Sequence, residues 1–205
     1  EAGFTYFDTA FVYLGSEAAA KKALVDRHPR ESFTLATKLN AHMLAPTEKA
    51  AKKQFYTSLE RTGAGYFDYY LLHALMENNY TKYDKFHIWD FVAEQKAKGL
   101  IKHVGFSFHA GPELLDKLLT DHPEVEFVQL QLNYADWENP DVTSRANYEV
   151  ARKHNKGIVV MEPVKGGRLA DPPAEVKKLF TDYAPEASPA SWAIRFVASL
   201  DGIIT

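Results

Sequence analysis

The sequence predicts an α/β protein built as a (β/α)8 TIM barrel, and three observations support that prediction. Its strand-like runs are continuously apolar instead of alternating, which is typical of parallel strands covered on both faces. Such runs begin at intervals of roughly thirty residues, with an amphipathic helical segment in each interval. With 205 residues, of which 46% are hydrophobic, the chain is long enough to bury a sizeable core without covalent cross-links.

Seven runs have the composition of strands. They occupy residues 4–9, 33–39, 66–73, 101–108, 126–134, 157–163 and 202–205. An eight-stranded barrel requires one more strand, which we expect before Glu1, and the run at 202–205 would begin the last strand. We therefore interpret residues 1–205 as a single barrel domain, a fragment that lacks its first strand and the part after the start of its last strand.

The helical segments between these runs have recognisable first residues. Ser16 precedes a helical pattern at 17–28, Thr47 precedes 48–62, Gly111 and Pro112 open 113–121, and Ser188 and Pro189 open 190–200. Glycine follows two helices, at Gly99 and Gly157, where we expect a left-handed cap.

An open doubly wound sheet is the alternative to the barrel. Open sheets that bind a dinucleotide usually place the motif G-x-G-x-x-G after an early strand. This sequence has no such motif, and its one comparable stretch, "VKGGRLA" at 164–170, comes late with the wrong spacing. The sequence therefore favours the closed barrel.

Composition excludes several classes of function. The chain has no cysteine, which excludes disulfides, thiolate catalysis and an iron-sulfur cluster within this segment. Its net charge is only -3 with scattered basic residues, so neither a nucleic acid nor an anionic membrane is an expected partner. No apolar run approaches the ~20 residues of a membrane span, and the histidines lack the spacing of metal ligands. We expect a soluble cytoplasmic protein without a bound metal.

Polar side chains mark the ends of three successive strands. Asp8 closes the first strand and Tyr13 follows in the loop, Lys38 closes the second strand, and His73 closes the third. In a (β/α) barrel the carboxyl ends of the strands meet at one mouth, where the chemistry takes place. Each of these residues alone is more often structural, but together they indicate a catalytic site.

The four residue types form a consistent set for carbonyl chemistry. A tyrosine can give a proton to a carbonyl oxygen, and a neighbouring lysine ammonium is expected to lower the tyrosine pKa. Asp8 would keep Lys38 charged, and His73 would orient the carbonyl group. A hydride donor is missing, because no protein side chain supplies one.

Six segments resemble the aldo-keto reductase superfamily in order and spacing. They are "GFTYFDTAFVYLGSE", "LATKL", "DYYLLHAL", "IKHVGFSF", "FVQLQLNYAD" and "MEPVKGG". The resemblance implies a (β/α)8 barrel that reduces a small aldehyde or ketone to an alcohol with NADPH, or less often NADH. It implies that Tyr13 is the general acid, that Asp8 and Lys38 tune it, and that His73 orients the carbonyl.

The same resemblance implies a set of cofactor-binding residues. Ser107 and Gln129 match positions that hold the nicotinamide carboxamide, while Met161 stands where an aromatic ring usually stacks on the nicotinamide and Phe108 where an asparagine is frequent. The segment 162–168 resembles the loop over the pyrophosphate, in which Lys165 or Arg168 would supply charge. The cofactor-binding set is Ser107, Gln129, Met161, Pro163, Val164, Gly166, Gly167 and Arg168.

Three phrases, "GFSFH", "MEPVKGG" and "SPASWAIRF", are most similar to a bacterial branch of the superfamily. Full-length members of that branch carry a C-terminal ferredoxin-like extension with an iron-sulfur cluster, which here would lie beyond Thr205. One alternative function stays open, a nicotinamide-binding sensor or regulatory barrel with little turnover. A barrel hydrolase or lyase would need paired carboxylates or a metal cluster at the mouth, and the sequence shows neither.

Overall fold

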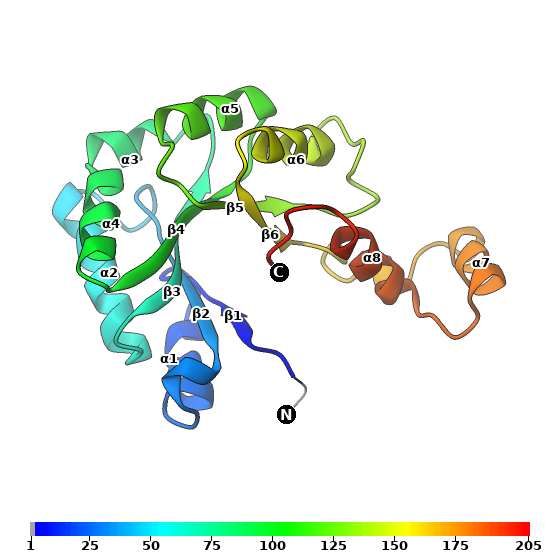
Figure 1. Ribbon diagram of the computed structural model, residues 1–205, viewed down its shortest axis with the longest axis horizontal. Helices are drawn as coiled ribbons and strands as arrows, with labels where there is room; N and C mark the ends of the chain where they lie inside the picture. The colour runs from blue at the N-terminus through cyan, green and yellow to red at the C-terminus, as the bar shows by residue number, and fades with distance from the viewer. Residues whose placement is uncertain (1–2) are drawn as a thin grey trace. The chain divides into compact units, whose positions relative to one another are not determined.

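The computed structural model of this chain describes residues 3–205, in which six strands alternate with helices (Figure 1). The strands are β1 (Tyr6–Asp8), β2 (Thr34–Leu39), β3 (Phe67–Leu75), β4 (Ile101–Phe108), β5 (Phe127–Gln131) and β6 (Gly157–Met161). They follow one another in the sheet in chain order, β1-β2-β3-β4-β5-β6, and β1 to β4 pair in parallel. The α/β fold class is confirmed, as a partial (β/α) barrel.

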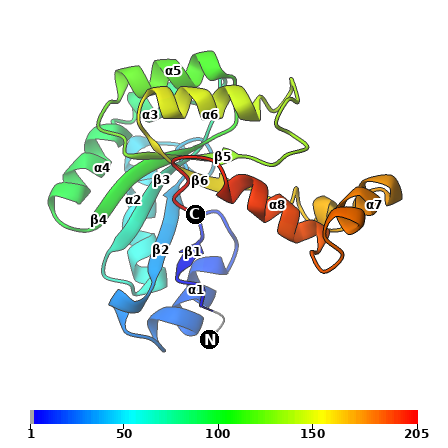
Figure 2. The same cartoon turned by 45° about the vertical axis from the view of Figure 1, so that its right-hand side comes forward.

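Helices connect the strands, as the turned view also shows (Figure 2). The α-helices of the described residues are α1 (Ser16–Ala20), α2 (Glu48–Thr62), α3 (Thr81–Lys85), α4 (Ile88–Ala97), α5 (Pro112–Asp121), α6 (Ser144–Lys153), α7 (Ala174–Tyr183) and α8 (Pro189–Ala198). A π-helical turn, η1 (Lys21–Val25), and two 3-10 turns, η2 (Arg30–Ser32) and η3 (Arg168–Ala170), complete the elements.

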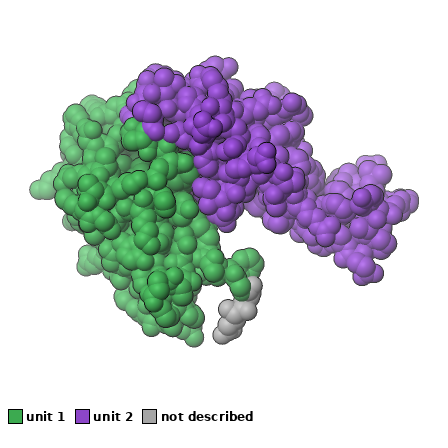
Figure 3. Space-filling view, in the orientation of Figure 1, with its two compact units in different colours: residues 1–108, 124–127 green, residues 109–123, 128–205 purple. Residues whose placement is uncertain are grey.

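The chain divides into two compact units (Figure 3). The first comprises the residues up to 108 together with 124–127, and the second comprises 109–123 together with 128–205. The first unit therefore contains β1 to β4, and the second contains β6 and most of β5. That residues 1–205 form a single domain stays a prediction.

Six of the seven predicted strands occur, most with shorter ends than the sequence predicts. One is longer, because β3 continues past His73 to Leu75. The seventh run, 202–205, forms a single parallel bridge between Ile158 and Ile203, in which Ile204 N donates to Ile158 O at 2.8 Å. In the second unit this run pairs with β6 as the last strand of the prediction would.

Three helix starts are confirmed and one is wrong. Gly111 occupies the N-cap of α5, and Pro112 is the first residue of that helix. Thr47 accepts a hydrogen bond from Ala50 N, and Ser188 accepts one from Ser191 N, so both cap their helices. Ser16 is not a cap: Gly15 occupies that position with φ 77°, and the Ser16 hydroxyl instead accepts a hydrogen bond from Thr9 at 2.7 Å. The predicted helix 17–28 also ends early, because α1 gives way to the π-helical turn η1.

The left-handed cap predicted at Gly157 is wrong as well, whereas the one at Gly99 is confirmed with φ 75°. Gly157 is the first residue of β6, and the left-handed turn after α6 falls on Asn155, at φ 55°. Asparagine tolerates this conformation because its short polar side chain bonds the local backbone.

Register places the polar strand-end residues of the first unit on one face of the sheet. Asp8 pairs with Ala36, and Lys38 pairs with Leu71. Because partners in parallel strands share a face and residues two apart share a face, Asp8, Lys38 and His73 project from the same side. The sheet itself therefore collects the candidate catalytic residues.

Aromatic side chains pack helix α2 against β3 and α4 in the first unit. Phe55 of α2 is fully buried. Its ring centroid lies 6.0 Å from that of Phe67, 5.1 Å from that of Tyr70 and 5.8 Å from that of Phe91. Edge-to-face rings at these separations add to the free energy gained by burial alone. This layer fixes α2 and α4 against β3.

Gly105 in β4 is a position where the first unit has no room for a side chain. A Cβ atom there would lie 2.4 Å from Phe127 O and 2.6 Å from the Phe127 ring. We expect Gly105→Ala to lower the free energy of unfolding by about 2 kcal/mol, since overpacking a filled core forces strands apart. Denaturant unfolding of the purified chain measures the change.

Gly111 provides the control, because a Cβ atom at that residue meets only the flexible Glu113 carboxylate, at 3.2 Å. Gly111→Ala should cost no more than about 1 kcal/mol, the usual loss for alanine at a helix N-cap. Equal losses for the two variants would contradict the close contact with Phe127.

Candidate active site

Lys38 is the buried centre of the site. Its side chain is 1% exposed, yet its ammonium forms an ion pair with the Asp8 carboxylate and donates a hydrogen bond to Thr9 O at 2.9 Å. The chain after β1 stays beside β2, because Phe11 N donates to Lys38 O at 3.1 Å. Asp8 is thereby held where the Lys38 side chain emerges.

Tyr13 lies directly over these groups. The Lys38 ammonium is 5.0 Å from the centroid of the Tyr13 ring, and the His73 ring meets the Tyr13 ring edge to face, with centroids 5.5 Å apart and planes at 84°. Tyr13 keeps 45% of its surface exposed, so a small molecule can reach its phenol. The structure thus brings Asp8, Tyr13, Lys38 and His73 together within the first unit.

Two further residues, which the sequence analysis missed, hold the loop that carries Tyr13. Glu17 is 2% exposed and accepts a hydrogen bond from Thr37 at 2.8 Å. Arg61 of α2 contacts Glu17 at 3.3 Å, donates to Phe11 O at 3.2 Å, and stacks over the Phe11 ring at 4.6 Å. The loop is therefore fastened to both β2 and α2.

His73 is held through its backbone as well as its place in β3. Tyr83, fully buried, donates its hydroxyl proton to His73 O at 2.5 Å. The next residue, Ala74, has a left-handed backbone with φ 58°. Its N–H donates to the hydroxyl of Ser107 at 2.7 Å, so Ser107, expected at the cofactor, also contacts the strand that carries His73.

Burial shifts the pKa values of Tyr13 and Lys38 in opposite directions. Burial, and after it the Asp8 carboxylate, raise the pKa of Tyr13 above its ordinary value. Burial lowers the pKa of Lys38, although its ion pair with Asp8 opposes that change. The lowered pKa expected for Tyr13 is therefore wrong in direction, because burial and the Asp8 charge both raise it.

The remaining predicted residues belong to the second unit. Gln129 is buried in β5, and Met161 ends β6. In the following loop, four residues take left-handed backbone conformations, and they are Glu162 (φ 57°), Lys165 (φ 51°), Gly166 (φ 60°) and Gly167 (φ 92°). Pro163 and Val164 are half-buried within it. Such a loop turns its backbone sharply, which lets a bound group approach closely.

The two cations of this loop differ in their surroundings. Lys165 forms an ion pair with Asp136, a fully buried carboxylate that also accepts hydrogen bonds from Gln131 at 2.9 Å and Asn133 at 2.8 Å. Arg168 is exposed, and its side chain makes no hydrogen bond or ion pair with the described residues. Arg168 is therefore the cation available to an anionic ligand.

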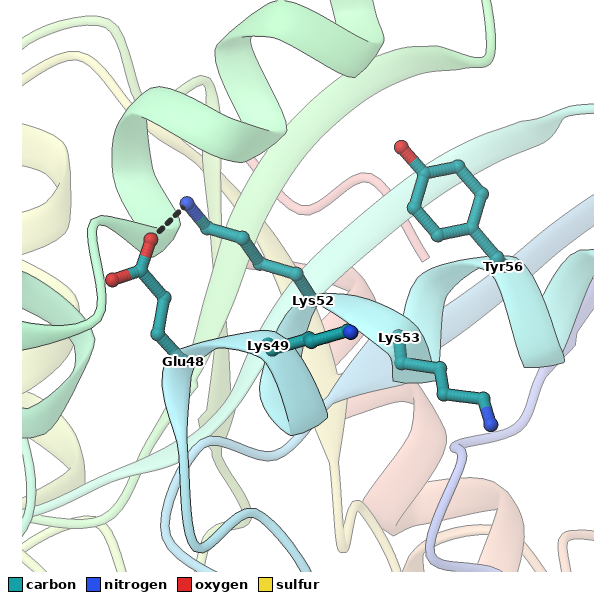
Figure 4. A pocket seen from close by; sticks show the side chains of 5 residues that line it. All are labelled: Glu48, Lys49, Lys52, Lys53 and Tyr56. Atoms are coloured by element: carbon teal, nitrogen blue, oxygen red, sulfur yellow. Dashed lines mark hydrogen bonds and ion pairs between the residues drawn. The ribbon is translucent and has the colours of Figure 1, made fainter.

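A pocket of about 580 Å³ lies elsewhere, on α2 (Figure 4). Its lining residues are Glu48, Lys49, Lys52, Lys53 and Tyr56, all from that helix. Lys52 is already bonded to Glu48 at 2.6 Å, and no strand end contributes a side chain. We interpret this pocket as a solvated helix face and not as the reaction centre.

Within residues 3–205, no three His, Cys, Asp or Glu side chains are arranged to hold a metal ion. Every helix in that range is too short or too polar to cross a lipid bilayer.

Comparisons with known proteins agree on one family. The model of the aldo/keto reductase family matches residues 1–204. An aldo-keto reductase of Mycobacterium avium is 27% identical over all of this chain, which spans 66% of that relative's length. One of Mycolicibacterium vanbaalenii is 35% identical over 54% of this chain and 38% of its own length.

Solved structures show the same fold. An aldo/keto reductase from Klebsiella pneumoniae, in complex with NADP and acetate, superposes with a TM-score of 0.77 at 20% identity, covering 98% of this chain and 69% of that one. The aldo/keto reductase of Brucella melitensis gives a TM-score of 0.74 at 22% identity, covering 98% and 72%.

The buried ion pair leads to a stability prediction. Asp8→Asn should lower the free energy of unfolding by about 3 kcal/mol, because it leaves the Lys38 ammonium buried without its counter-charge. Adding Lys38→Met to Asp8→Asn should restore most of that loss, since the charge is then gone. Urea unfolding of the single and double variants measures both changes.

Simple additivity of the two substitutions would contradict a direct pairing of Asp8 with Lys38.

Proposed function

This chain belongs to the aldo/keto reductase family, and from that premise we propose that it reduces an aldehyde or ketone to an alcohol with a nicotinamide cofactor, NADPH in the first instance. The observation that supports the proposal is the contact of four side chains, Asp8, Tyr13, Lys38 and His73, in the first unit. We assign these four as the catalytic residues.

Tyr13 acts as the general acid. It gives the proton of its hydroxyl to the carbonyl oxygen as negative charge develops there, and the product alcohol forms. Its raised pKa keeps the phenol protonated through neutral pH, which an acid requires. Because its ring is half-exposed while the groups behind it are buried, the substrate approaches from the open side.

Lys38 and Asp8 stabilise the charge that the proton transfer leaves behind. The phenolate formed at Tyr13 lies next to the Lys38 ammonium, and a buried cation near a developing anion acts in a low dielectric where its field is strong. Asp8 keeps Lys38 protonated and fixed in place. Asp8 therefore serves Tyr13 through Lys38.

His73 orients the substrate. Its ring is in edge contact with Tyr13, so a carbonyl oxygen bonded to the imidazole also lies near the phenol. A hydrogen bond that fixes the carbonyl in this position converts a loose encounter into an oriented one. For this role His73 needs only one imidazole N–H as donor, which both the neutral and the charged ring provide, and its backbone does not have to move.

The residues of the chain fit a nicotinamide cofactor on two observations. The Arg168 guanidinium is exposed and forms no ion pair with the described residues, and it follows Gly166 and Gly167 in the chain. A phosphate could pair with this guanidinium and approach the glycine backbone closely. Ser107 lies next to the carboxyl end of β4 and Gln129 lies in the middle of β5; both are buried, and both match positions where the family binds the carboxamide. The reduced nicotinamide supplies the hydride when bound.

We propose the full set Ser107, Gln129, Met161, Pro163, Val164, Gly166, Gly167 and Arg168 as the cofactor-binding residues, with Arg168 in preference to Lys165 as the cation for the pyrophosphate. The Klebsiella pneumoniae relative holds NADP in its structure, which supports NADPH over NADH. An iron-sulfur extension beyond Thr205 and a cytoplasmic location stay predictions.

Replacement of Tyr13 tests the assignment of the acid. We expect Tyr13→Phe to lower kcat for aldehyde reduction by at least about 10²-fold, because the proton donor is lost. NADPH affinity should change little, since the phenol is not among the proposed cofactor residues. Steady-state NADPH consumption and fluorescence titration measure the two quantities.

Tyr56→Phe on α2 is the matched control and should keep full activity, because Tyr56 is exposed and its only ring contacts within residues 3–205 are with Phe55 and Phe91, which are not among the four catalytic residues. A Tyr13→Phe enzyme that keeps more than about a tenth of the wild-type rate would remove Tyr13 from this role. If the wild-type chain binds NADPH but consumes none with any aldehyde, the sensor function replaces the reductase.

The pH dependence of reduction gives a second test. Reduction needs protonated Tyr13 and charged Lys38, so kcat/KM should fall as pH rises into the alkaline range. Because burial lowers the pKa of Lys38, loss of the Lys38 charge should contribute to the fall together with loss of the Tyr13 proton. Rates from pH 6 to about 11 measure the profile.

Asp8→Asn should move this fall to lower pH. The Asp8 carboxylate raises the pKa of both Lys38 and Tyr13, so its removal lets both groups lose their protons earlier. An unchanged or upward-shifted profile would contradict the assignment of Asp8.

A further inference from the structure

β3 leaves its regular ladder with β4 at the point where it carries His73. Leu72 pairs with Phe106, but the next pair is Leu75 with Phe108, so two residues of β3, His73 and Ala74, stand opposite Ser107 alone. This is the arrangement of a β-bulge, which bends a strand and redirects a side chain, and such bulges are frequent beside active sites.

The bulge has an unfavourable backbone. Ala74 adopts φ 58°, a left-handed conformation that residues with a Cβ atom avoid. Nothing in the sequence around it favours this conformation, since no glycine or asparagine occupies position 74. The conformation therefore depends on contacts made by other residues.

Two buried side chains supply those contacts, one to each polar group of the Ala74 backbone. Ser107 is 1% exposed, and its hydroxyl accepts a hydrogen bond from Ala74 N at 2.7 Å. Asn79 is 6% exposed, and its amide donates to Ala74 O at 2.8 Å while its carbonyl oxygen accepts from Met76 N at 3.0 Å. The peptide groups on both sides of Ala74 are thus fixed.

We propose that Ser107 and Asn79 are positioning residues that hold the bulge, so that the His73 ring faces Tyr13. The inference rests on the proposed reductase function, in which His73 orients the carbonyl. If the bulge relaxed into a regular ladder, the bend of β3 at His73 would be lost and the His73 side chain would be redirected, because a bulge bends its strand and re-aims the side chains it carries. Neither residue needs to touch the substrate.

Ser107 is also a proposed cofactor-binding residue, so replacing Asn79 instead of Ser107 distinguishes the positioning role from cofactor binding. The Ser107 oxygen accepts the Ala74 N–H, which leaves the hydroxyl proton for another partner such as the nicotinamide carboxamide. Replacing Ser107 should therefore disturb both His73 and cofactor binding. Replacing Asn79, which is not among the proposed cofactor residues, should disturb His73 alone.

The test compares Asn79→Ala with Asn147→Ala in the same chain. Asn147 is a matched control in the second unit, 5% exposed, whose amide donates to a backbone oxygen, Ala110 O, at 3.0 Å. We expect Asn79→Ala to lower kcat for aldehyde reduction by at least about tenfold, because a small misplacement of a reacting group is costly. NADPH affinity should stay within about twofold of the wild type. Asn147→Ala should leave kcat nearly unchanged.

A double-mutant cycle with His73→Ala distinguishes positioning from general destabilisation. If Asn79 acts through His73, then Asn79→Ala should lower kcat less than about twofold further in the His73→Ala background. An Asn79→Ala effect of equal size in both backgrounds would overturn the inference, as would a kcat unaffected by Asn79→Ala.

Asn79→Asp provides a second variant if Asn79→Ala does not fold. It keeps an acceptor for Met76 N, but it loses the amide donor to Ala74 O and turns a carboxylate oxygen toward that carbonyl, so it should reproduce the loss of kcat. Full activity of folded Asn79→Asp would also overturn the inference. Absence of turnover in the wild-type chain would instead remove the reductase function itself, and the inference with it.

Discussion

The ion pair between Lys38 and Asp8 is the interaction on which the candidate site depends. A lysine side chain that is 1% exposed is unstable as a charged group unless a carboxylate accompanies it. The sheet meets this requirement through register, because Asp8 at the end of β1 pairs with Ala36, which is two residues before Lys38 on β2 and shares its face. With the pair in place, a cation lies beneath the Tyr13 ring, where a phenolate would form. The chemistry of the site is thus a consequence of strand pairing.

The same pair explains why the protonation of Tyr13 differs from the simple expectation. A list of neighbours suggests that the ammonium lowers the tyrosine pKa. In the folded chain burial raises the pKa of Tyr13, and the carboxylate that keeps Lys38 charged raises it further. In the proposed reaction the phenol therefore keeps its proton until negative charge develops on the oxygen of the substrate carbonyl.

Local sequence signals were sufficient for most of the fold and for the convergence of the candidate residues. Strand positions followed from the spacing of apolar runs, and Thr47 and Ser188 cap helices as their side-chain chemistry predicts. The misplaced features depend on tertiary contacts. Ser16 does not cap its helix because its hydroxyl accepts a hydrogen bond from Thr9. The bulge at Ala74 could not be predicted because no glycine marks its left-handed residue.

The residues that support the site were hidden for the same reason. Glu17 and Arg61 are 44 positions apart and meet only in the folded chain, so neither carried a signal that could be assigned in advance. Their contact has an evolutionary consequence. Arg61 and Glu17 hold the base of the Tyr13 loop. The tip of that loop, at Leu14, is fully exposed and is not needed to hold it in place. Mutations at the tip can therefore alter the surface beside Tyr13 while the proposed proton donor stays where it is, so that selectivity would be free to drift while the proposed chemistry is inherited.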